Sequence, residues 1–109
     1  MALSVFILDG AKDDYREIRK YVKQKFGKKI WQDSDQQYKE LLKNMAEYPS
    51  AGLVPDEAMQ LGLQGLRERL VEQTRVIYEV APHSLYVHMF VSTRRDFMTM
   101  LAERVLKSE

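Results

Sequence analysis

Arginine is the residue type in this chain best suited to binding a charged partner. Arg94 and Arg95 are adjacent in the stretch VSTRRDFMTMLAERVL, between an apolar run and a helical pattern, and Arg104 follows within that pattern. Each exposed cation at a helix N-terminus lies near the positive end of the helix dipole and costs about 0.3 to 1 kcal/mol of helix stability. Helix capping therefore does not explain the Arg94–Arg95 pair. We expect these three arginines to contact another macromolecule. The structural alternative is that Asp96 pairs with Arg95 and only fixes this joint.

Three further arginines lie in predicted strands. Arg67 and Arg69 share one face of a strand because side chains alternate, and Arg75 begins the next strand. Arg94 and Arg95 end the last strand, so if these strands are neighbours, several of the five guanidiniums could converge on one surface and bind phosphate or carboxylate bidentately. Ordinary surface ion pairs are the alternative, because such pairs are common and individually weak. The carboxylates available for pairing are Glu68, Glu72, Glu79 and Asp96.

Other side chains with catalytic or metal-binding chemistry are few. The chain has no cysteine and only two histidines, His83 in a predicted turn and His88 in a predicted strand. His88 alternates with aromatic residues, so we interpret it as a packed, hydrogen-bonded histidine rather than a general base. Asp13 and Asp14 open a predicted helix, where carboxylates favour the positive end of the dipole. The sequence thus predicts no metal site, no cofactor and no catalytic residue.

Composition and charge indicate a small intracellular protein. Its 109 residues suffice for one domain over 1–109. The lack of cysteine suits the reducing cytoplasm, and the start MALSVFILDG is neither a signal peptide nor a membrane span. Seventeen Lys and Arg against sixteen Asp and Glu give a net charge of +1. This near-neutral charge predicts no direct DNA binding by the protein alone.

Hydrophobic periodicity predicts the first elements. Residues 4–8 are a short apolar run that indicates a strand, followed by a DG turn. Two helices, over 11–26 and 30–48, are then expected as an antiparallel hairpin with Gly27 at its bend. Their apolar stripes are Ala11, Tyr15, Ile18, Val22 and Phe26, then Trp31, Tyr38, Leu41, Leu42 and Met45. The first helix is also the most basic region, and its cations either face solvent or meet a partner.

The second half predicts a loop over 49–65, with one helical turn at 57–61, and then three strands in a meander. The last two strands are apolar on both faces, so they belong in the middle of a sheet covered by the helix hairpin. The final helix has apolar positions at Phe97, Met100, Leu101 and Val105. The predicted fold is α+β, a mostly antiparallel sheet on an N-terminal helix hairpin, with a C-terminal helix. If the first strand joins the sheet beside the last, its edge is covered as well.

Motifs along nearly the whole chain resemble the RelE/ParE superfamily of bacterial toxins. AKDDYREIRKYV resembles the A-x-x-D-[LY]-x-x-I-x-x-Y-[VI] start of these proteins, and LRERLVEQTRVIYEV is similar to their strand hairpin. YPSAGLVPDE looks like the loop between these parts. STRRDFMTMLAERVL resembles the ParE branch, in which H-x-R-x-D-x-x-x-x-L-A-x-R follows the last strand. A Ser-Thr pair replaces the usual histidine here. The matching positions of the first motif are Ala11, Asp14, Tyr15, Ile18, Tyr21 and Val22.

The resemblance implies the toxin of a type II toxin-antitoxin module. Its partner would be a ParD-like antitoxin, a ribbon-helix-helix DNA-binding protein with an acidic, amphipathic tail, in a toxin-antitoxin hetero-oligomer. ParE-like proteins poison DNA gyrase without a catalytic site and arrest growth, whereas RelE-like proteins cut ribosome-bound messenger RNA. We expect the acidic tail to meet Arg67, Arg69 or the basic first helix at Arg16 and Arg19, and target contact at Arg94, Arg95 and Arg104.

The nuclease alternative depends on arginines near the cations of the RelE branch, namely Arg67, Arg69, Arg75 and Arg95. The nuclease branch often carries an aromatic acid or base shortly after the last strand. Phe97, Met98, Met100 and Leu101 follow it here. None of these can move a proton, and near-neutral charge does not favour docking into ribosomal RNA. We favour gyrase inhibition by a non-enzymatic toxin, with ribosome-dependent cleavage as the alternative and a regulatory binding domain as a third hypothesis.

Overall fold

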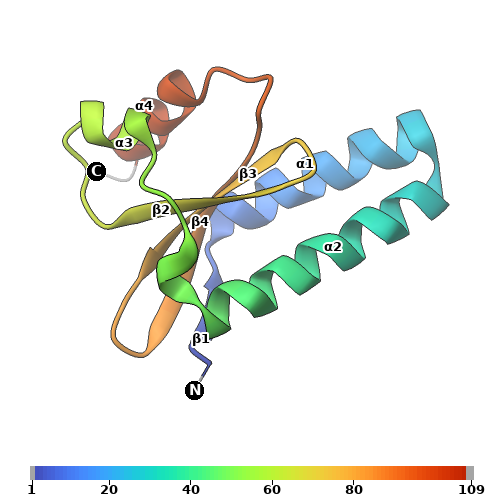
Figure 1. Ribbon diagram of the computed structural model, residues 1–109. Helices are drawn as coiled ribbons and strands as arrows, with labels where there is room; N and C mark the ends of the chain where they lie inside the picture. The colour runs from blue at the N-terminus through green and yellow to red at the C-terminus, as the bar shows by residue number, and fades with distance from the viewer. Residues whose placement is uncertain (1, 108–109) are drawn as a thin grey trace.

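The computed structural model describes residues 2–107, with side chains described up to Arg104. Its α-helices and strands, labelled in Figure 1, are β1 (Ser4–Ile7), α1 (Asp9–Phe26), α2 (Lys28–Glu47), α3 (Asp56–Gln60), β2 (Leu66–Val71), β3 (Thr74–Val80), β4 (Ser84–Ser92) and α4 (Phe97–Lys107). A 3-10 turn, η1 (Pro49–Ala51), follows α2. The side chain of Val105, an expected apolar position of the last helix, lies outside this description. No helix in the described part of the chain is long and apolar enough to cross a membrane.

The four strands form one sheet in the order β1-β4-β3-β2. β2, β3 and β4 are an antiparallel meander, and β1 pairs in parallel with β4, with Phe6 opposite Tyr86. The β3–β4 register shifts between Ile77, which pairs with Met89, and Tyr78, which pairs with Val87, so His88 is the extra residue of a bulge in β4. The expectation of a mostly antiparallel sheet is confirmed, and β1 lies beside β4, the place that the sequence left open.

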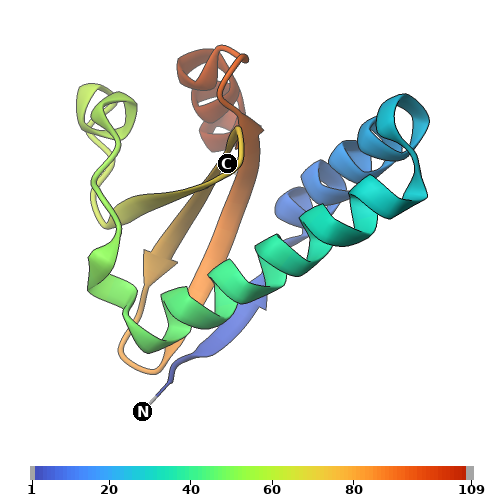
Figure 2. The same cartoon turned by 45° about the vertical axis from the view of Figure 1, so that its right-hand side comes forward.

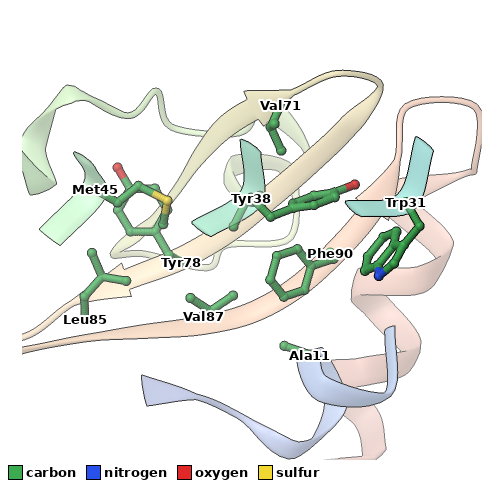
Figure 3. Packing of buried hydrophobic residues seen from close by; sticks show 10 residues of the cluster. Ala11, Trp31, Tyr38, Met45, Val71, Tyr78, Leu85, Val87 and Phe90 are labelled. Atoms are coloured by element: carbon green, nitrogen blue, oxygen red, sulfur yellow. The ribbon is translucent and has the colours of Figure 1, made fainter. Parts of the chain in front are cut away.

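One face of the sheet packs against the α1–α2 hairpin. The core between them contains Trp31, Tyr38 and Met45 from α2 and Val76, Tyr78, Leu85, Val87 and Phe90 from the strands, as Figure 3 shows. The rings of Tyr15, Tyr38 and Phe90 are in mutual contact, with centroids 5.1 to 5.8 Å apart. The alternating apolar residues of β3 and β4 therefore find the cover that their pattern predicts.

The opposite face is covered by α3 and α4, which lie across the sheet from the hairpin in Figure 2. Phe97 and Leu101 of α4 pack with Ile77, Met89 and Val91 of the strands. The hairpin is therefore not the only cover. β3 and β4 are apolar on both sides because each side meets a helix layer.

Two sequence interpretations are wrong at the hairpin. Asp9 and Gly10 do not form a turn, because Leu8 is the extended N-cap residue and both belong to the first turn of α1. Phe26, expected in the buried stripe, is 56% exposed, and Tyr21 is 50% exposed. The reason is visible in Figure 2, where the hairpin projects beyond the sheet, so its tip has no strand to cover.

Candidate functional site

The adjacent arginines lie at the joint between β4 and α4. Asp96 caps α4, because its carboxylate accepts hydrogen bonds from the Thr99 backbone N–H at 3.1 Å and from the Thr99 hydroxyl at 2.8 Å. The same backbone bond holds the pKa of Asp96 below its usual value. The alternative that Asp96 pairs with Arg95 is thus wrong. Within the described residues, no carboxylate lies within 4.0 Å of the Arg94 or Arg95 guanidinium, and both residues are exposed.

Arg94 and Arg95 line a groove of about 940 Å³ between the outer half of α1 and the ends of β3 and β4. Ile18 and Val22 of α1 and Phe90 of β4 supply apolar lining. These residues are buried or partly buried and belong to the hairpin core. The groove therefore has an apolar floor that continues the core to the surface, with arginine at its edge.

The outer part of α1 adds phenol, ammonium and aromatic groups to this groove. The Lys25 Nζ donates a hydrogen bond to the Tyr21 hydroxyl at 2.9 Å and lies 5.5 Å from the Phe26 ring centroid. The Lys25 bond holds the pKa of the Tyr21 phenol below its ordinary value, and the charge of Arg94 acts in the same direction. Lys25 and Tyr21 are thus in contact, and both line the groove together with Arg94.

Arg75 lies on the other face of the sheet, in a network of carboxylates. Its Nη1 and Nη2 donate to the two carboxylate oxygens of Glu57, each at 2.9 Å, and Nη2 also donates to Glu68. The guanidinium carbon lies 4.3 Å from the Phe97 ring centroid, and the side chain is 16% exposed. The bond from Arg75 lowers the pKa of Glu57, and the bond to Glu57 raises the pKa of Arg75 above its usual range.

Arg67 and Arg69 are on the hairpin side and are bonded within the molecule. Arg67 donates to the Gly52 carbonyl at 2.9 Å, and Arg69 donates to the Asn44 side chain at 3.0 Å. β2 and β3 are neighbours as expected, but Arg75 pairs with Leu70, so alternation turns it away from Arg67 and Arg69. Arg75 therefore does not converge with Arg67 and Arg69 on one surface, and this part of the expectation is wrong.

Arg104 faces the sheet and not the solvent. Its Nη2 donates to Asp14 at 2.9 Å and its Nη1 to the His88 carbonyl at 3.0 Å, while Asp14 also accepts the Phe90 N–H at 3.1 Å. The target contact expected at Arg104 would therefore require this guanidinium to leave Asp14 and the His88 carbonyl. The capping role of Asp14 is wrong, because α1 begins at Asp9 and places Asp14 in its second turn.

The remaining predicted residues take surface positions. Asp13 does not cap the helix but pairs with Arg16 at 2.6 Å on the exposed face of α1, and Arg19 is exposed on the same helix. His88 is hydrogen-bonded as expected, to Glu79 at 2.9 Å, but its side chain is 33% exposed and only partly packed. No group of three metal-binding side chains occurs among the described residues.

Sequence reasoning missed the contribution of α1 to the groove. Tyr21 and Lys25 do not belong to the apolar stripe of α1, and they follow each other at the four-residue spacing that puts side chains on one face. An aromatic residue outside the apolar stripe of a basic helix is the available signal. Only the fold reveals that this face turns toward Arg94 and Arg95.

Comparison with known proteins supports the fold. No protein-family model matches the chain, and no curated protein matches its sequence. Among solved structures, a chain of the chromosomal ParDE TA system from P. aeruginosa is similar, with a TM-score of 0.69 and 15% sequence identity. The similarity covers 84% of this chain and 96% of that chain. It confirms the predicted α+β fold, a mostly antiparallel sheet on an N-terminal helix hairpin with a C-terminal helix.

Proposed function

We propose that this protein is the toxin of a type II toxin-antitoxin module, that it inhibits DNA gyrase, and that a ParD-like antitoxin neutralises it. The fold similarity to a chain of a ParDE system supports the toxin assignment. The observation that carries the target site is the Arg94–Arg95 pair, which is exposed and has no carboxylate within 4.0 Å among the described residues. Two adjacent cations at a helix N-terminus are unfavourable for the helix, so a contact with a partner explains them better than folding does.

The positions of the other arginines support a non-enzymatic mechanism. A guanidinium whose two Nη atoms already bind carboxylates cannot present that fork to phosphate without losing those partners, and Arg75 is bound in this way by Glu57 and Glu68. Arg67 and Arg69 are bonded to a backbone carbonyl and to Asn44. Of the four arginines of the nuclease hypothesis, Arg95 alone keeps an exposed side chain without an ion pair within the described residues.

One observation favours the nuclease alternative. Tyr21 lies in the groove near Arg94, and its hydroxyl accepts a hydrogen bond from Lys25, which lowers its pKa. A phenol with a lowered pKa beside cations is a candidate for proton transfer at a phosphodiester. Ribosome-dependent cleavage of messenger RNA is therefore kept as the second function, with Tyr21 in place of the missing aromatic acid or base of the last helix.

Antitoxin contact was expected at Arg67, Arg69, Arg16 and Arg19. Arg16 and Arg19 are exposed on α1, whereas Arg67 and Arg69 are partly buried and hydrogen-bonded. We propose that α1 provides the larger electrostatic share of this interface. Arg104 is removed from the proposed target contacts, because its guanidinium is engaged by Asp14.

The test is the double variant Arg94→Ala with Arg95→Ala, expressed in cells. Growth arrest, the DNA-damage response and gyrase-mediated DNA cleavage are each expected to be lost. The matched control is Lys28→Ala with Lys29→Ala, an adjacent and exposed cation pair at the start of α2, which should stay toxic. Circular dichroism confirms that both variants fold. If the folded Arg94/Arg95 variant is as toxic as the parent, these two arginines are not the target contact.

A further inference from the structure

We propose that the tip of the α1–α2 hairpin, residues 21–30, binds the surface of an anionic phospholipid bilayer. The contact would be peripheral, with the tip in the headgroup region of one leaflet. This inference goes beyond the proposed function and does not depend on it, because it uses neither Arg94 nor Arg95. The hairpin projects beyond the sheet in Figure 2, so its tip has no strand beneath it.

Positive charge at the tip and on the adjoining helical turns is not balanced by acidic residues. Residues 18–32 contain no carboxylate side chain. The cations of this stretch are Arg19, Lys20, Lys23, Lys25, Lys28 and Lys29. All of them are exposed, and none forms an ion pair within the described part of the chain. A protein with a net charge of only +1 thus has one strongly cationic end, which attracts anionic surfaces.

Folding explains only two of the four lysines at the tip. Lys23 and Lys25 lie in the last turn of α1, where cations favour the negative end of the helix dipole. Lys28 and Lys29 open α2, where cations oppose the dipole, and the first turn of α2 has no acidic residue. Gly27, the N-cap residue of α2, makes no side-chain hydrogen bond to the helix. A cation pair that is unfavourable for its own helix indicates contact with an anionic partner.

Large aromatic and aliphatic side chains are exposed among these lysines. Tyr21, Phe26 and Ile30 expose 50%, 56% and 47% of their surface. All three lie within residues 21–30, on either side of the bend at Gly27. Exposed apolar side chains that are grouped in this way, rather than scattered singly, indicate an interaction site. The partner must therefore offer an apolar environment as well as negative charge.

The contacts of Lys25 show how one surface can meet both requirements. Its Nζ lies 5.4 Å from the Tyr21 ring centroid and 5.5 Å from the Phe26 ring centroid. A long lysine stem lies along apolar groups while its ammonium stays in a polar layer. Phe26 can thus enter the boundary between headgroups and acyl chains while the Lys25 ammonium remains among the phosphates.

Charge, apolar exposure and shape together favour a bilayer over other anionic partners. The phosphates of duplex DNA or RNA would attract the lysines but leave Phe26 and Ile30 in water. An acidic protein would need a cleft that fits a projecting end, whereas a fluid bilayer adapts to it. Lysine is a compact, strongly hydrated charge without the planar fork of arginine, so it suits a fluid layer of phosphates better than bidentate recognition of one phosphate.

Co-sedimentation with lipid vesicles tests the proposal. The probes are vesicles of phosphatidylcholine alone and vesicles of phosphatidylcholine mixed equally with phosphatidylglycerol. We expect the protein to bind the mixed vesicles and not the neutral ones, and to bind more weakly as added salt screens the charges. Equal binding to both kinds of vesicle, or binding to neither, would overturn the proposal.

A pair of charge variants locates the cationic contact. Lys28→Glu with Lys29→Glu should weaken binding to the mixed vesicles about tenfold or more. The matched control is Lys12→Glu with Lys43→Glu, which makes the same change in net charge at exposed positions near the opposite ends of the same helices. Urea denaturation should show no loss of stability in the Lys28/Lys29 variant, because carboxylates at the start of α2 favour its dipole. Equal losses of binding in variant and control would refute the tip as the site.

A pair of apolar variants separates insertion from general attraction of charge. Phe26→Ala with Ile30→Ala should also weaken binding to the mixed vesicles about tenfold. Leu53→Ala with Met59→Ala is the control, because both residues are exposed apolar side chains outside the tip. Vesicle binding that is unchanged in the Phe26/Ile30 variant would overturn the proposal. Binding of duplex DNA or single-stranded RNA by the parent, without binding to the mixed vesicles, would assign the tip to nucleic acid instead.

A fluorescent label reports which end of the molecule meets the bilayer. The chain has no cysteine, so Gln24→Cys at the tip and Gln60→Cys at the end of α3 each give a single labelling site, and both glutamines are exposed. An environment-sensitive fluorophore at position 24 should shift its emission to shorter wavelength on mixed vesicles, and one at position 60 should not. Equal shifts at the two sites would contradict the proposed orientation.

Toxicity in cells separates this inference from the proposed function. Lys28→Ala with Lys29→Ala keeps Arg94 and Arg95, so it should bind the mixed vesicles more weakly and stay toxic. Arg94→Ala with Arg95→Ala should lose toxicity and still bind these vesicles. A loss of vesicle binding as large in the arginine variant as in the lysine variant would overturn the assignment to the tip. A toxic arginine variant that binds vesicles would refute the proposed target contact and leave the bilayer contact intact.

Discussion

Asp13 and Asp14 are adjacent, chemically identical residues with different roles. Asp13 is exposed and pairs with Arg16, whereas Asp14 is 13% exposed and joins α1 to the Phe90 N–H and to Arg104. Sequence reasoning treated both as helix caps, because residue type and proximity to a helix start do not show which aspartate faces the sheet. The difference depends on a contact between residues 14 and 104, which no local pattern contains.

At these two positions we predict a clear difference in stability. Asp14→Ala should lower the free energy of unfolding by about 1 to 3 kcal/mol. It removes the carboxylate that accepts hydrogen bonds from the Phe90 N–H and from the Arg104 guanidinium. Asp13→Ala removes an exposed pair and should cost less than about 1 kcal/mol. Urea denaturation of both variants measures this difference. Equal losses would mean that the Asp14 contacts contribute nothing beyond a surface pair.

Glu57 should make stability depend on acidity. Because Arg75 lowers the pKa of this carboxyl in the folded state, its contribution is fully present above the unfolded value of about 4.3 and is lost as pH falls through the folded pKa. The unfolding free energy of the parent should therefore exceed that of Glu57→Gln near neutral pH, and the gap should close in acid. Urea titrations over a pH series test this. A gap that stays constant would contradict it.

At the scale of elements, periodicity predicted most of the fold and little of the site. The hairpin, the meander and the central place of β3 and β4 in the sheet follow from local patterns and from the doubly apolar strands. The Asp9-Gly10 pair is typical of turns, but this preference reflects only the two residues themselves. In the fold both belong to α1, where Gly10 lies next to Arg104. The groove could not be foreseen, because it forms where α1 passes the end of β4, and their relative placement depends on packing over the whole chain.

The contact between α1 and α4 restricts the residue type at position 10. The change Gly10→Ala should therefore alter the free energy of unfolding in opposite directions with and without Arg104. A Cβ at this position would lie 2.7 Å from Arg104 Nη1 and 3.3 Å from its Cζ. Gly10→Ala alone should destabilise the protein by displacing the guanidinium from Asp14. In an Arg104→Ala background the same change should stabilise it by about 0.5 to 1 kcal/mol, because alanine favours a helix over glycine. A double-mutant cycle by urea denaturation measures the effect of Gly10→Ala in the parent and in the Arg104→Ala background. A change of the same sign in both would contradict the proposed contact between Gly10 and Arg104.

At the scale of the whole molecule, the balance of charge separates the two candidate functions. A net charge of +1 gives weak general attraction to RNA, since such attraction depends on neutralising many phosphates. The cations that remain exposed without an ion pair in the described part of the chain include Arg94 and Arg95, which are gathered at one groove. Such a distribution suits a local contact with a protein better than docking over a ribosomal surface.

We therefore predict that the purified protein does not cleave ribosome-bound messenger RNA and does not arrest translation in a cell-free system. Tyr21→Phe should stay toxic in cells, because it removes only the phenol proton and leaves the aromatic ring in the groove, while Arg94→Ala with Arg95→Ala should not. Primer extension on a translated message detects cleavage. Tyr21→Phe should leave the fold unchanged, because Tyr21 is 50% exposed, so it tests the hydroxyl alone. Cleavage by the parent that disappears in Tyr21→Phe would assign the groove to a phosphodiester and the protein to the nuclease alternative, because no other part of the target-contact hypothesis requires that hydroxyl.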